Sequence, residues 1–352
     1  MAELQISALR KSYGTFTALN GVDLEVGASE LVALLGPSGC GKTTILRSIA
    51  GFIPVTSGQI TINGKDVTHL APQRRNTGMV FQNYALFPHM TVEQNVGFGL
   101  EMRKIARDEI RRRVAEALDL VSLSAFAQRM PQALSGGQQQ RVAVARALVV
   151  QPDVFLLDEP LSNLDAKLRQ SVGMQLRALQ TRLGLTTVFV THDQKEALMM
   201  ADRLVIMRNG RIVQQGDTQH LYAHPATRFV ADFLGAANVL PGRIHPEGFE
   251  IGGGTLVRCD TGKARPDMVL SVRPENVVLS PAAGEHANSF TGTVQAVTYL
   301  GGLVEVEVVL PGGAVVTAHH PNRIGTRPVP DIGSDVTVGW HPEATQILVD
   351  DL

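Results

Sequence analysis

The sequence predicts an α/β domain built on a parallel sheet, followed by a smaller all-β domain. Three apolar runs, at residues 154–157, 188–190 and 204–207, are continuous rather than alternating, which is typical of strands buried on both faces of a parallel sheet. Beyond about Gly235, glycines and prolines separate short strands, including the alternating segment 304–308. With 352 residues, the chain is long enough for two or three domains with substantial cores.

The first part of the chain indicates how the α/β domain begins. Residues 31–35 form a short apolar strand that ends in a glycine-rich turn, and a helix follows over residues 43–50, where Gly51 ends it. Residues 104–123 place apolar side chains mostly three to four positions apart among Arg and Glu, which indicates a helix with one buried stripe.

These elements predict the domain organisation. We expect a helical insert at about residues 84–150 and a sheet that continues to about residue 220. The α/β domain is expected to cover residues 1–235 and the all-β domain residues 236–352.

Composition argues against several classes of protein. Lys and Arg number 32 against 33 Asp and Glu, a formal charge of -1, so we expect no nucleic-acid partner. Cys40 and Cys259 are the only cysteines, which indicates no disulfide framework and fits a reducing, cytoplasmic setting. No run of about 18 apolar residues occurs, so a membrane role is expected only through association with other chains.

The turn after the first strand matches a phosphate-binding loop. It follows the pattern G-x-x-x-x-G-K-[ST] and lies between a strand and a helix, as that motif requires. Glycines let backbone N–H groups converge on phosphate oxygens, Lys42 can reach the β- and γ-phosphates, and Thr43 can ligate magnesium. The loop reads Gly36, Pro37, Ser38, Gly39, Cys40, Gly41, Lys42 and Thr43.

A second set of polar residues follows later in the chain. Residues 134–138 precede a helix expected over residues 139–149, so Ser135 can cap that helix while two glycines expose backbone donors. Asp158 and Glu159 end a buried strand, where the first can hold magnesium and the second can orient or deprotonate a water. His192 follows the next buried strand and can contact the γ-phosphate.

Taken in order, these residues resemble the ATP-binding cassette ATPases of ABC transporters. The resemblance implies a P-loop NTPase cassette with a helical subdomain, ATP and Mg²⁺ as ligands, and ATP hydrolysis as the activity. It implies catalytic roles for Lys42, Gln82, Glu159 and His192. It implies Mg²⁺ contacts by Thr43, Gln82 and Asp158. It implies nucleotide contacts by Tyr13, Gly36, Pro37, Ser38, Gly39, Cys40, Gly41, Lys42, Thr43, Thr44, Ser135, Gly136, Gly137, Gln138 and Asp165.

By the same resemblance, each motif has a role. Gln82 is the glutamine that senses magnesium and the membrane subunit, and Asp158 is the Walker B aspartate. Glu159 is the catalytic base, His192 the switch histidine, and Tyr13 stacks on adenine.

Plain structural interpretations remain open beside these roles. Gln82 can be a solvated loop residue, Tyr13 a packing aromatic and Asp165 the N-cap of the helix that follows it. A lone histidine such as His192 is more often structural than catalytic.

The resemblance also implies partners. One cassette per chain implies a homodimer in which residues 134–138 complete the site of the opposite subunit. It implies two integral membrane permease subunits, gripped by the loop at residues 83–96, a periplasmic or extracellular solute-binding protein, and a place at the cytoplasmic face of the inner membrane.

The tail from about Gly235 is similar to the small OB-like β-barrel called TOBE, found in bacterial importers. Among these the sequence is most similar to the polyamine (spermidine/putrescine), ferric-iron and phosphonate group, and polyamine is the expected cargo. Two other interpretations are weighed against transport. One is a soluble ABC ATPase acting on nucleic acid or ribosomes, and the other is a β-barrel that binds a small ligand or an oligonucleotide, with the ATPase as its regulator.

Overall fold

The computed structural model describes residues 2–262, 267–280, 286–323 and 328–351. The chain divides into two units, Met1–Leu221 and Tyr222–Leu352, each with its own hydrophobic core. Among the described residues, no helix combines the length and the apolar character needed to span a bilayer.

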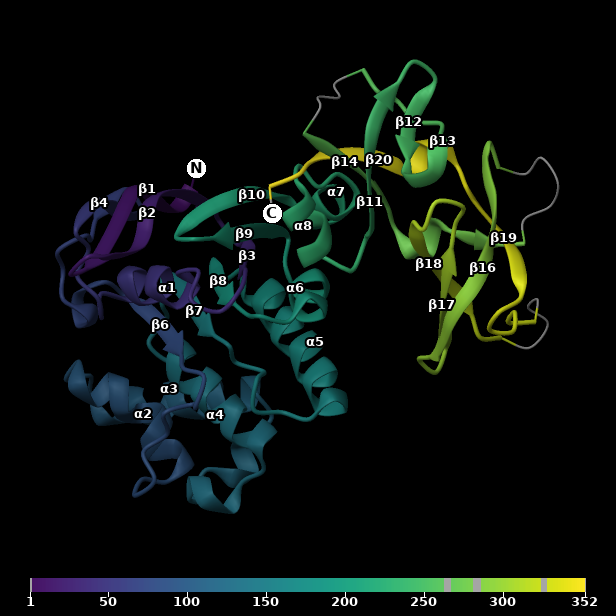
Figure 1. The fold of residues 1–352 in the computed structure, drawn as a ribbon. Helices are drawn as coiled ribbons and strands as arrows, with labels where there is room; N and C mark the ends of the chain where they lie inside the picture. Colours follow the sequence, from purple (N-terminus) through teal and green to yellow (C-terminus); the bar gives the residue numbers. More distant parts are fainter. Residues whose placement is uncertain (1, 263–266, 281–285, 324–327, 352) are drawn as a thin grey trace. The chain divides into compact units, whose positions relative to one another are not determined.

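The central sheet of the first unit has six strands in the order β10-β9-β3-β8-β7-β6 (Figure 1). Strands β9, β3, β8, β7 and β6 are parallel to their neighbours, whereas β10 runs antiparallel to β9 at one edge. Every residue of β3, β7 and β8 is buried, which is why these strands have continuous apolar sequences. The strands are β3 (Leu31–Leu35), β6 (Thr77–Val80), β7 (Val154–Asp158), β8 (Thr187–Val190), β9 (Arg203–Arg208) and β10 (Arg211–Asp217).

A second, antiparallel sheet in the first unit has the order β2-β1-β4-β5. Its strands are β1 (Ala2–Tyr13), β2 (Phe16–Gly27), β4 (Ser57–Ile62) and β5 (Lys65–Asp66). Leu4, Ile6 and Leu24 of this sheet belong to the same buried cluster as the central strands, so one core joins the two sheets.

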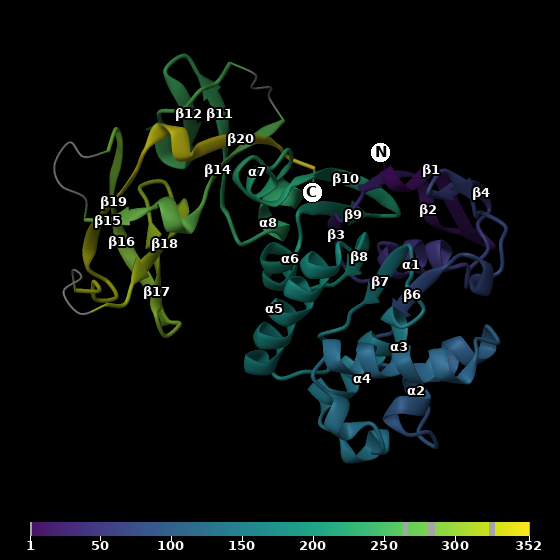
Figure 2. The same cartoon turned by 180° about the vertical axis from the view of Figure 1, so that it is seen from behind.

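Six α-helices lie wholly within the described part of the first unit. They are α1 (Lys42–Ala50), α2 (Val92–Met102), α3 (Arg107–Leu120), α4 (Gly136–Leu148), α5 (Ala166–Leu183) and α6 (Gln194–Met200). Helices α2, α3 and α4 contact one another and form the expected helical insert (Figures 1 and 2). Helix α4 starts earlier than expected because Ser135 caps it: its hydroxyl accepts from the Gln138 N–H, and the Gln138 side chain accepts from the Ser135 N–H.

The loop expected over residues 83–96 is shorter in the structure, because α2 already begins at Val92. Thr91 caps this helix in the same reciprocal way. Glycines inside α2 weaken the helical signal of its sequence. Packing explains one of them: a Cβ on Gly97 would lie 3.3 Å from the Val114 side chain of α3.

The second unit contains two five-stranded antiparallel sheets, in the orders β13-β12-β11-β14-β20 and β15-β19-β16-β17-β18. The first consists of β11 (Asn238–His245), β12 (Gly248–Ile251), β13 (Thr255–Val257), β14 (Met268–Val272) and β20 (Thr345–Val349). The second consists of β15 (Val278–Leu279), β16 (Asn288–Tyr299), β17 (Leu303–Val309), β18 (Val315–Pro321) and β19 (Asp335–Trp340). Val304, Val306 and Val308 of β17 are buried while the residues between them are partly exposed, as the alternating sequence predicts, and Trp340 is fully buried in the core.

The division of the chain falls within α7 (Thr218–Ala223), earlier than the boundary expected after residue 235. Helix α8 (Arg228–Phe233) therefore belongs to the second unit. The Arg273 side chain explains this, because it donates to the carbonyls of Ala231 and Tyr222 at 3.2 and 3.0 Å and stacks 4.1 Å from the Tyr222 ring. Together with the ion pair between Arg228 and Asp350 at 3.2 Å, this guanidinium fixes the segment before β11 to the β-sheet.

We expect Arg273→Met to lower the free energy of unfolding of the second unit by about 3 kcal/mol, because it removes charge-assisted bonds to backbone carbonyls. Trp340 is the only tryptophan and lies in this unit, so fluorescence-detected urea unfolding reports on it specifically. Arg243→Met, which removes an ion pair to Glu250 from a mostly exposed arginine, is the control and should shift the transition little. Equal shifts in the two variants would contradict the anchoring role of Arg273.

Candidate functional site

The carboxyl ends of four neighbouring parallel strands carry the residues singled out in the sequence. The phosphate loop follows β3, His192 follows β8, Asp158 ends β7 with Glu159 directly after it, and Gln82 follows β6. Since carboxyl ends of adjacent parallel strands lie at one edge of a sheet, these side chains are placed together.

The loop between β3 and α1 requires glycine at defined positions. Gly39 and Gly41 have φ angles of 80° and 110°, in a region that favours glycine. A Cβ on Gly36 would lie 2.3 Å from the Met207 carbonyl oxygen, and one on Gly41 would lie 2.8 Å from the Ala18 carbonyl oxygen. The glycines therefore let the loop pass close to two neighbouring strands.

Lys42 is turned back onto this loop. It is only 6 % exposed, and its ammonium donates to the carbonyl oxygens of Gly36 and Pro37 at 2.7 and 3.0 Å. Cys40 is buried, and its sulfur lies 3.8 Å from the same ammonium. Neutral carbonyls are weaker partners for this cation than phosphate oxygens, so an incoming nucleotide can compete for the lysine.

Asp158 lies beside the first residues of α1. Its carboxylate is 3.4 Å from the Thr43 hydroxyl, which donates to it, and 3.6 Å from the Arg47 guanidinium. Burial raises the pKa of Asp158, while Arg47 and Thr43 oppose this shift. Sequence analysis missed Arg47; its position one helical turn after Thr43, on the same face of α1, is the signal that could have found it.

Glu159 is the point where three segments of the chain meet. Its Oε2 accepts a hydrogen bond from the Gln82 Nε2 at 2.9 Å and lies 3.3 Å from the His192 Nδ1. Glu159 has a φ of 44°, an uncommon value for a residue other than glycine. The Ser162 hydroxyl donates to its carbonyl at 2.9 Å, and its N–H donates to the Val190 carbonyl. The structure thus holds a strained backbone at the centre of this cluster.

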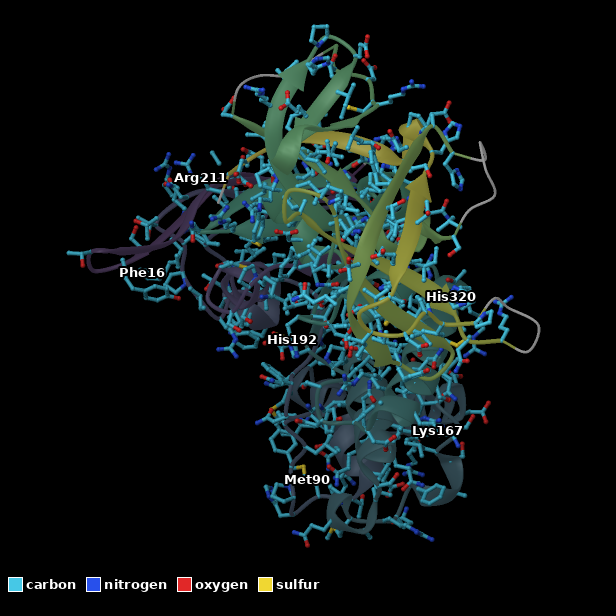
Figure 3. All side chains as sticks on the ribbon, turned by 45° about the vertical axis from the view of Figure 1, so that its right-hand side comes forward. Phe16, Met90, Lys167, His192, Arg211 and His320 are labelled. Atoms are coloured by element: carbon cyan, nitrogen blue, oxygen red, sulfur yellow. The ribbon has the colours of Figure 1, made fainter. Side chains whose placement is uncertain are left out.

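A cavity of about 360 Å³ joins the phosphate loop to the tip of the β1–β2 hairpin. It is lined by Tyr13, Phe16, Ala18, Ser38, Gly39, Gly41, Lys42, Thr43, Thr44 and Glu159. Tyr13 and Phe16 are paired across the hairpin and are 48 % and 61 % exposed, and Figure 3 shows Phe16 projecting from the hairpin. Sequence analysis missed Phe16, although the two-residue turn at Gly14 places it opposite Tyr13.

The residues at the start of α4 lie elsewhere. Of the described residues, those that line the phosphate-loop cavity do not include Ser135, Gly136, Gly137 or Gln138. The Ser135 and Gln138 side chains bond to the first turn of their own helix. The Asp165 side chain accepts from the Leu168 N–H at 2.9 Å and so caps α5. It therefore has the N-cap role that the sequence leaves open for it beside nucleotide contact.

Two parts of the chain match known protein families. Residues 19–162 match the family model described as ABC transporter, and residues 270–348 match the model described as TOBE domain. A spermidine/putrescine import ATP-binding protein of Thermobifida fusca is 45 % identical, covering 96 % of this chain and 90 % of the relative. An Fe(3+) ions import ATP-binding protein of Rhizobium etli is 48 % identical over 97 % of this chain and 96 % of the relative.

This chain belongs to the ABC transporter family. It is an ATPase subunit of the importer group, which hydrolyses ATP to power import and works with membrane permeases and binding proteins. An sn-glycerol-3-phosphate import ATP-binding protein of Chromohalobacter salexigens is 48 % identical over 89 % of this chain and 85 % of the relative. The solved structure of cbiO1 from Clostridium perfringens, part of the ABC transporter complex cbiONQ, matches with a TM-score of 0.59 and 32 % identity over 63 % of this chain and 91 % of that one.

The donor set of this ABC ATPase fits Mg²⁺ bound together with a nucleotide. Thr43 and Asp158 offer the oxygen ligands that Mg²⁺ prefers, and the buried carboxylate lacks a full cationic partner because Arg47 is half-exposed and 3.6 Å away. In the described part of the chain, no group of three or more His, Cys, Asp and Glu side chains is placed to hold a metal. The remaining ligands would therefore be phosphate oxygens and water.

We expect Asp158→Asn to raise the free energy of unfolding of the nucleotide-free protein near pH 7 by about 1 kcal/mol. A carboxyl whose pKa is raised on folding stabilises the folded state while it is protonated, below its unfolded pKa, and this contribution is lost as the pH rises through the folded pKa. The amide of the variant does not titrate, so the variant is the more stable protein where the Asp158 carboxyl is ionised. Its advantage over the unchanged protein should therefore shrink as the pH falls toward about 4. Urea unfolding followed by circular dichroism at several pH values measures this. Asp153→Asn, at an exposed position, is the control, and a less stable Asp158→Asn protein at neutral pH would refute the prediction.

Proposed function

We propose that this chain is one of two identical ATPase subunits located at the cytoplasmic face of the inner membrane. There they drive the import of a polyamine, such as spermidine or putrescine. The Thermobifida fusca relative, named for spermidine/putrescine import, supports this cargo over nearly the whole chain. Ferric iron is the second candidate, supported by the Rhizobium etli relative, and 2-aminoethylphosphonate is a third. The glycerol-3-phosphate relative widens the range of solutes that the test must include.

The observation that carries the hydrolytic part of the proposal is the contact of Gln82 and His192 with one carboxylate oxygen of Glu159. A carboxylate has about four acceptor positions, so two donors leave room for a water molecule. We assign Glu159 as the base that takes the proton from water as its oxygen attacks the γ-phosphorus, and the bond to the ADP oxygen breaks. His192 and Gln82 orient the Glu159 carboxylate, and each can also contact the γ-phosphate or the groups bound to it.

The other residues of the site bind and position the nucleotide. Lys42 exchanges its loop carbonyls for β- and γ-phosphate oxygens, and the loop N–H groups from Gly39 to Thr44 face the phosphates at the N-terminus of α1. Thr43 and Asp158, together with Gln82, would hold Mg²⁺, which would neutralise charge on the phosphate oxygens. Tyr13 and Phe16 offer aromatic faces at the outer end of the cavity, where a purine can stack.

A second copy of the chain completes the site in this proposal. Each chain has one phosphate loop and one motif at residues 134–138, and the motif is not part of its own cavity. Because Ser135 and Gln138 bond to each other, the anion donors left at this helix start include backbone N–H groups such as those of Gly136 and Gly137. Two subunits arranged head to tail can present these donors to each other's nucleotide.

We expect Glu159→Gln to lower the rate of ATP hydrolysis by about 10²- to 10⁴-fold while leaving ATP affinity unchanged, because the amide cannot accept the proton. The variant should also accumulate as an ATP-bound dimer in gel filtration, since hydrolysis no longer separates the subunits. A malachite-green phosphate assay and a fluorescent nucleotide titration give the two quantities. Glu101→Gln, on the exposed side of α2, is the matched control, and near-normal turnover of Glu159→Gln would remove Glu159 from this role.

The cargo is tested in the assembled transporter. The ATPase is reconstituted with its two membrane subunits in lipid nanodiscs, and hydrolysis is measured with the solute-binding protein loaded in turn with spermidine, putrescine, Fe³⁺, 2-aminoethylphosphonate or glycerol-3-phosphate. We expect the polyamines to stimulate ATP hydrolysis, because the solute acts through the binding protein and permeases. Stimulation by another solute replaces the polyamine assignment. Stimulation by nucleic acid or ribosomes without membrane subunits contradicts transport altogether.

A further inference from the structure

The turn that follows Gln82 has an unusual backbone. Tyr84 and Ala85 have φ angles of 60° and 47°, so two consecutive residues with side chains lie in the left-handed region. This conformation is unfavourable for L-residues with a Cβ. The Tyr84 N–H donates to the Phe81 carbonyl at 2.9 Å, which closes a turn around Gln82. Such a conformation persists only where surrounding contacts hold it.

Arg146 of α4 makes the contacts that hold this turn. One guanidinium nitrogen donates to the Ala85 carbonyl at 2.7 Å and the other donates to the Tyr84 carbonyl at 2.8 Å. The guanidinium also lies 5.6 Å from the centre of the Phe87 ring. Burial lowers the pKa of Arg146, and the planar fork of an arginine suits two neighbouring carbonyls in a way that a lysine cannot reproduce.

Other side chains also contact the segment at residues 82–90, but on the side of α4 the contact near Gln82 is made by Arg146. Asn95 of α2 fixes the far end of the segment, accepting from the Phe87 N–H and donating to the carbonyls of Phe87 and Met90. On the other side, the Asn163 side chain donates to the Gln82 carbonyl at 2.7 Å. The backbone at Gln82 is therefore held from two sides, by Asn163 at its own carbonyl and by Arg146 through the turn that follows it.

We propose that Arg146 is a positioning residue for ATP hydrolysis: by holding the Tyr84–Ala85 turn it keeps the Gln82 amide on Glu159. This inference rests on the roles proposed for Gln82 and Glu159. It connects α4, whose first turn carries the motif at residues 134–138, to the carboxylate that accepts the proton of the attacking water. A change in the position of α4 is thereby passed to Glu159 through the Arg146 side chain, the backbone of the turn and the Gln82 side chain.

The test is a double-mutant cycle on the full-length protein. Arg146→Met removes both donors at similar length and should lower kcat by about 10- to 100-fold, with the KM for ATP unchanged, because the nucleotide contacts remain while Gln82 is displaced. Arg146→Lys should restore part of the rate. In a Gln82→Ala background, Arg146→Met should have no further effect on kcat, because the group through which it acts is gone.

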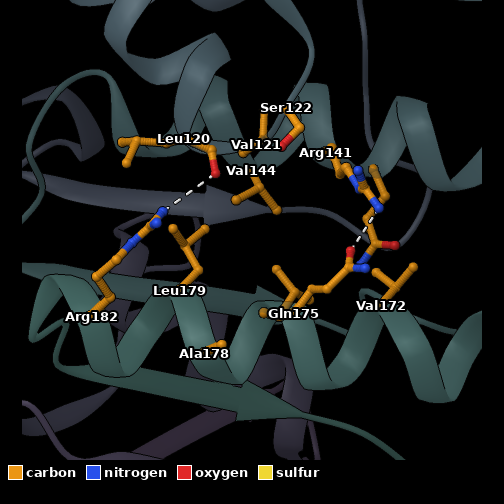
Figure 4. Close-up of a pocket in the computed structure, with 12 residues that line it drawn as sticks. Leu120, Val121, Ser122, Arg141, Val144, Val172, Gln175, Ala178, Leu179 and Arg182 are labelled. Atoms are coloured by element: carbon orange, nitrogen blue, oxygen red, sulfur yellow. Dashed lines mark hydrogen bonds between the residues drawn. The ribbon is translucent and has the colours of Figure 1, made fainter.

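Arg141→Met is the matched control on the same helix. The Arg141 guanidinium donates to Gln175 of α5 at 2.6 Å, as Figure 4 shows. Because this bond is to α5 rather than to the turn, the variant should keep its kcat. Hydrogen exchange should rise in residues 82–87 of Arg146→Met and not in Arg141→Met. Where Arg146→Met does not fold, Arg146→Lys carries the same cycle.

Two results separate the inference from the function on which it rests. If Gln82→Ala lowers kcat and Arg146→Met lowers it by the same factor with and without Gln82, the positioning role is overturned and the role of Gln82 stands. If Gln82→Ala keeps full activity, the proposed role of Gln82 fails, and the inference fails with it.

Discussion

Parallel pairing of β3, β8, β7 and β6 is the constraint on which the site depends. Each strand delivers one part of the site from its carboxyl end: the phosphate loop, His192, the carboxylate pair and Gln82. These residues are separated by long stretches of sequence, but neighbouring strands in a sheet lie about 5 Å apart. The full burial of β3, β7 and β8 fixes this pairing, because a shift of register would expose apolar side chains or move the strand ends apart.

The same edge of the sheet concentrates features that cost stability. Asp158 is a buried carboxylate whose cationic neighbour, Arg47, is half-exposed, Lys42 is a buried ammonium held by neutral carbonyls, and Glu159 has a positive φ. The surrounding contacts offset part of this cost: Ser162 and Val190 bond to the backbone of Glu159, and Arg47 lies beside Asp158. A site in this state is prepared for an anionic ligand, which can satisfy Lys42 and the loop N–H groups at once.

The helical insert is connected to this edge by polar contacts as well as by packing. Arg146 reaches from α4 to the turn after Gln82, and Asn95 reaches from α2 to the other end of the same segment. Buried polar side chains that bond to a loop backbone fix its conformation more specifically than apolar contacts do. The second unit is organised separately, around Trp340 and the valines of β17, with Arg273 holding the segment before its first strand.

The sequence alone determined the fold class, the phosphate loop, the positions of the buried strands along the chain and the identity of the family, because each of these leaves a local pattern of residue types. Continuous apolar runs identified β3, β7, β8 and β9, and the loop motif lay in the strand-to-helix context that its chemistry requires. It also named Gln82, Glu159 and His192, which the structure brings together. Tertiary structure alone decided the place of α8, the contacts of Arg146 with the turn after Gln82, and the separation of residues 134–138 from their own cavity. These features arise between segments that are distant in sequence, so no local pattern records them.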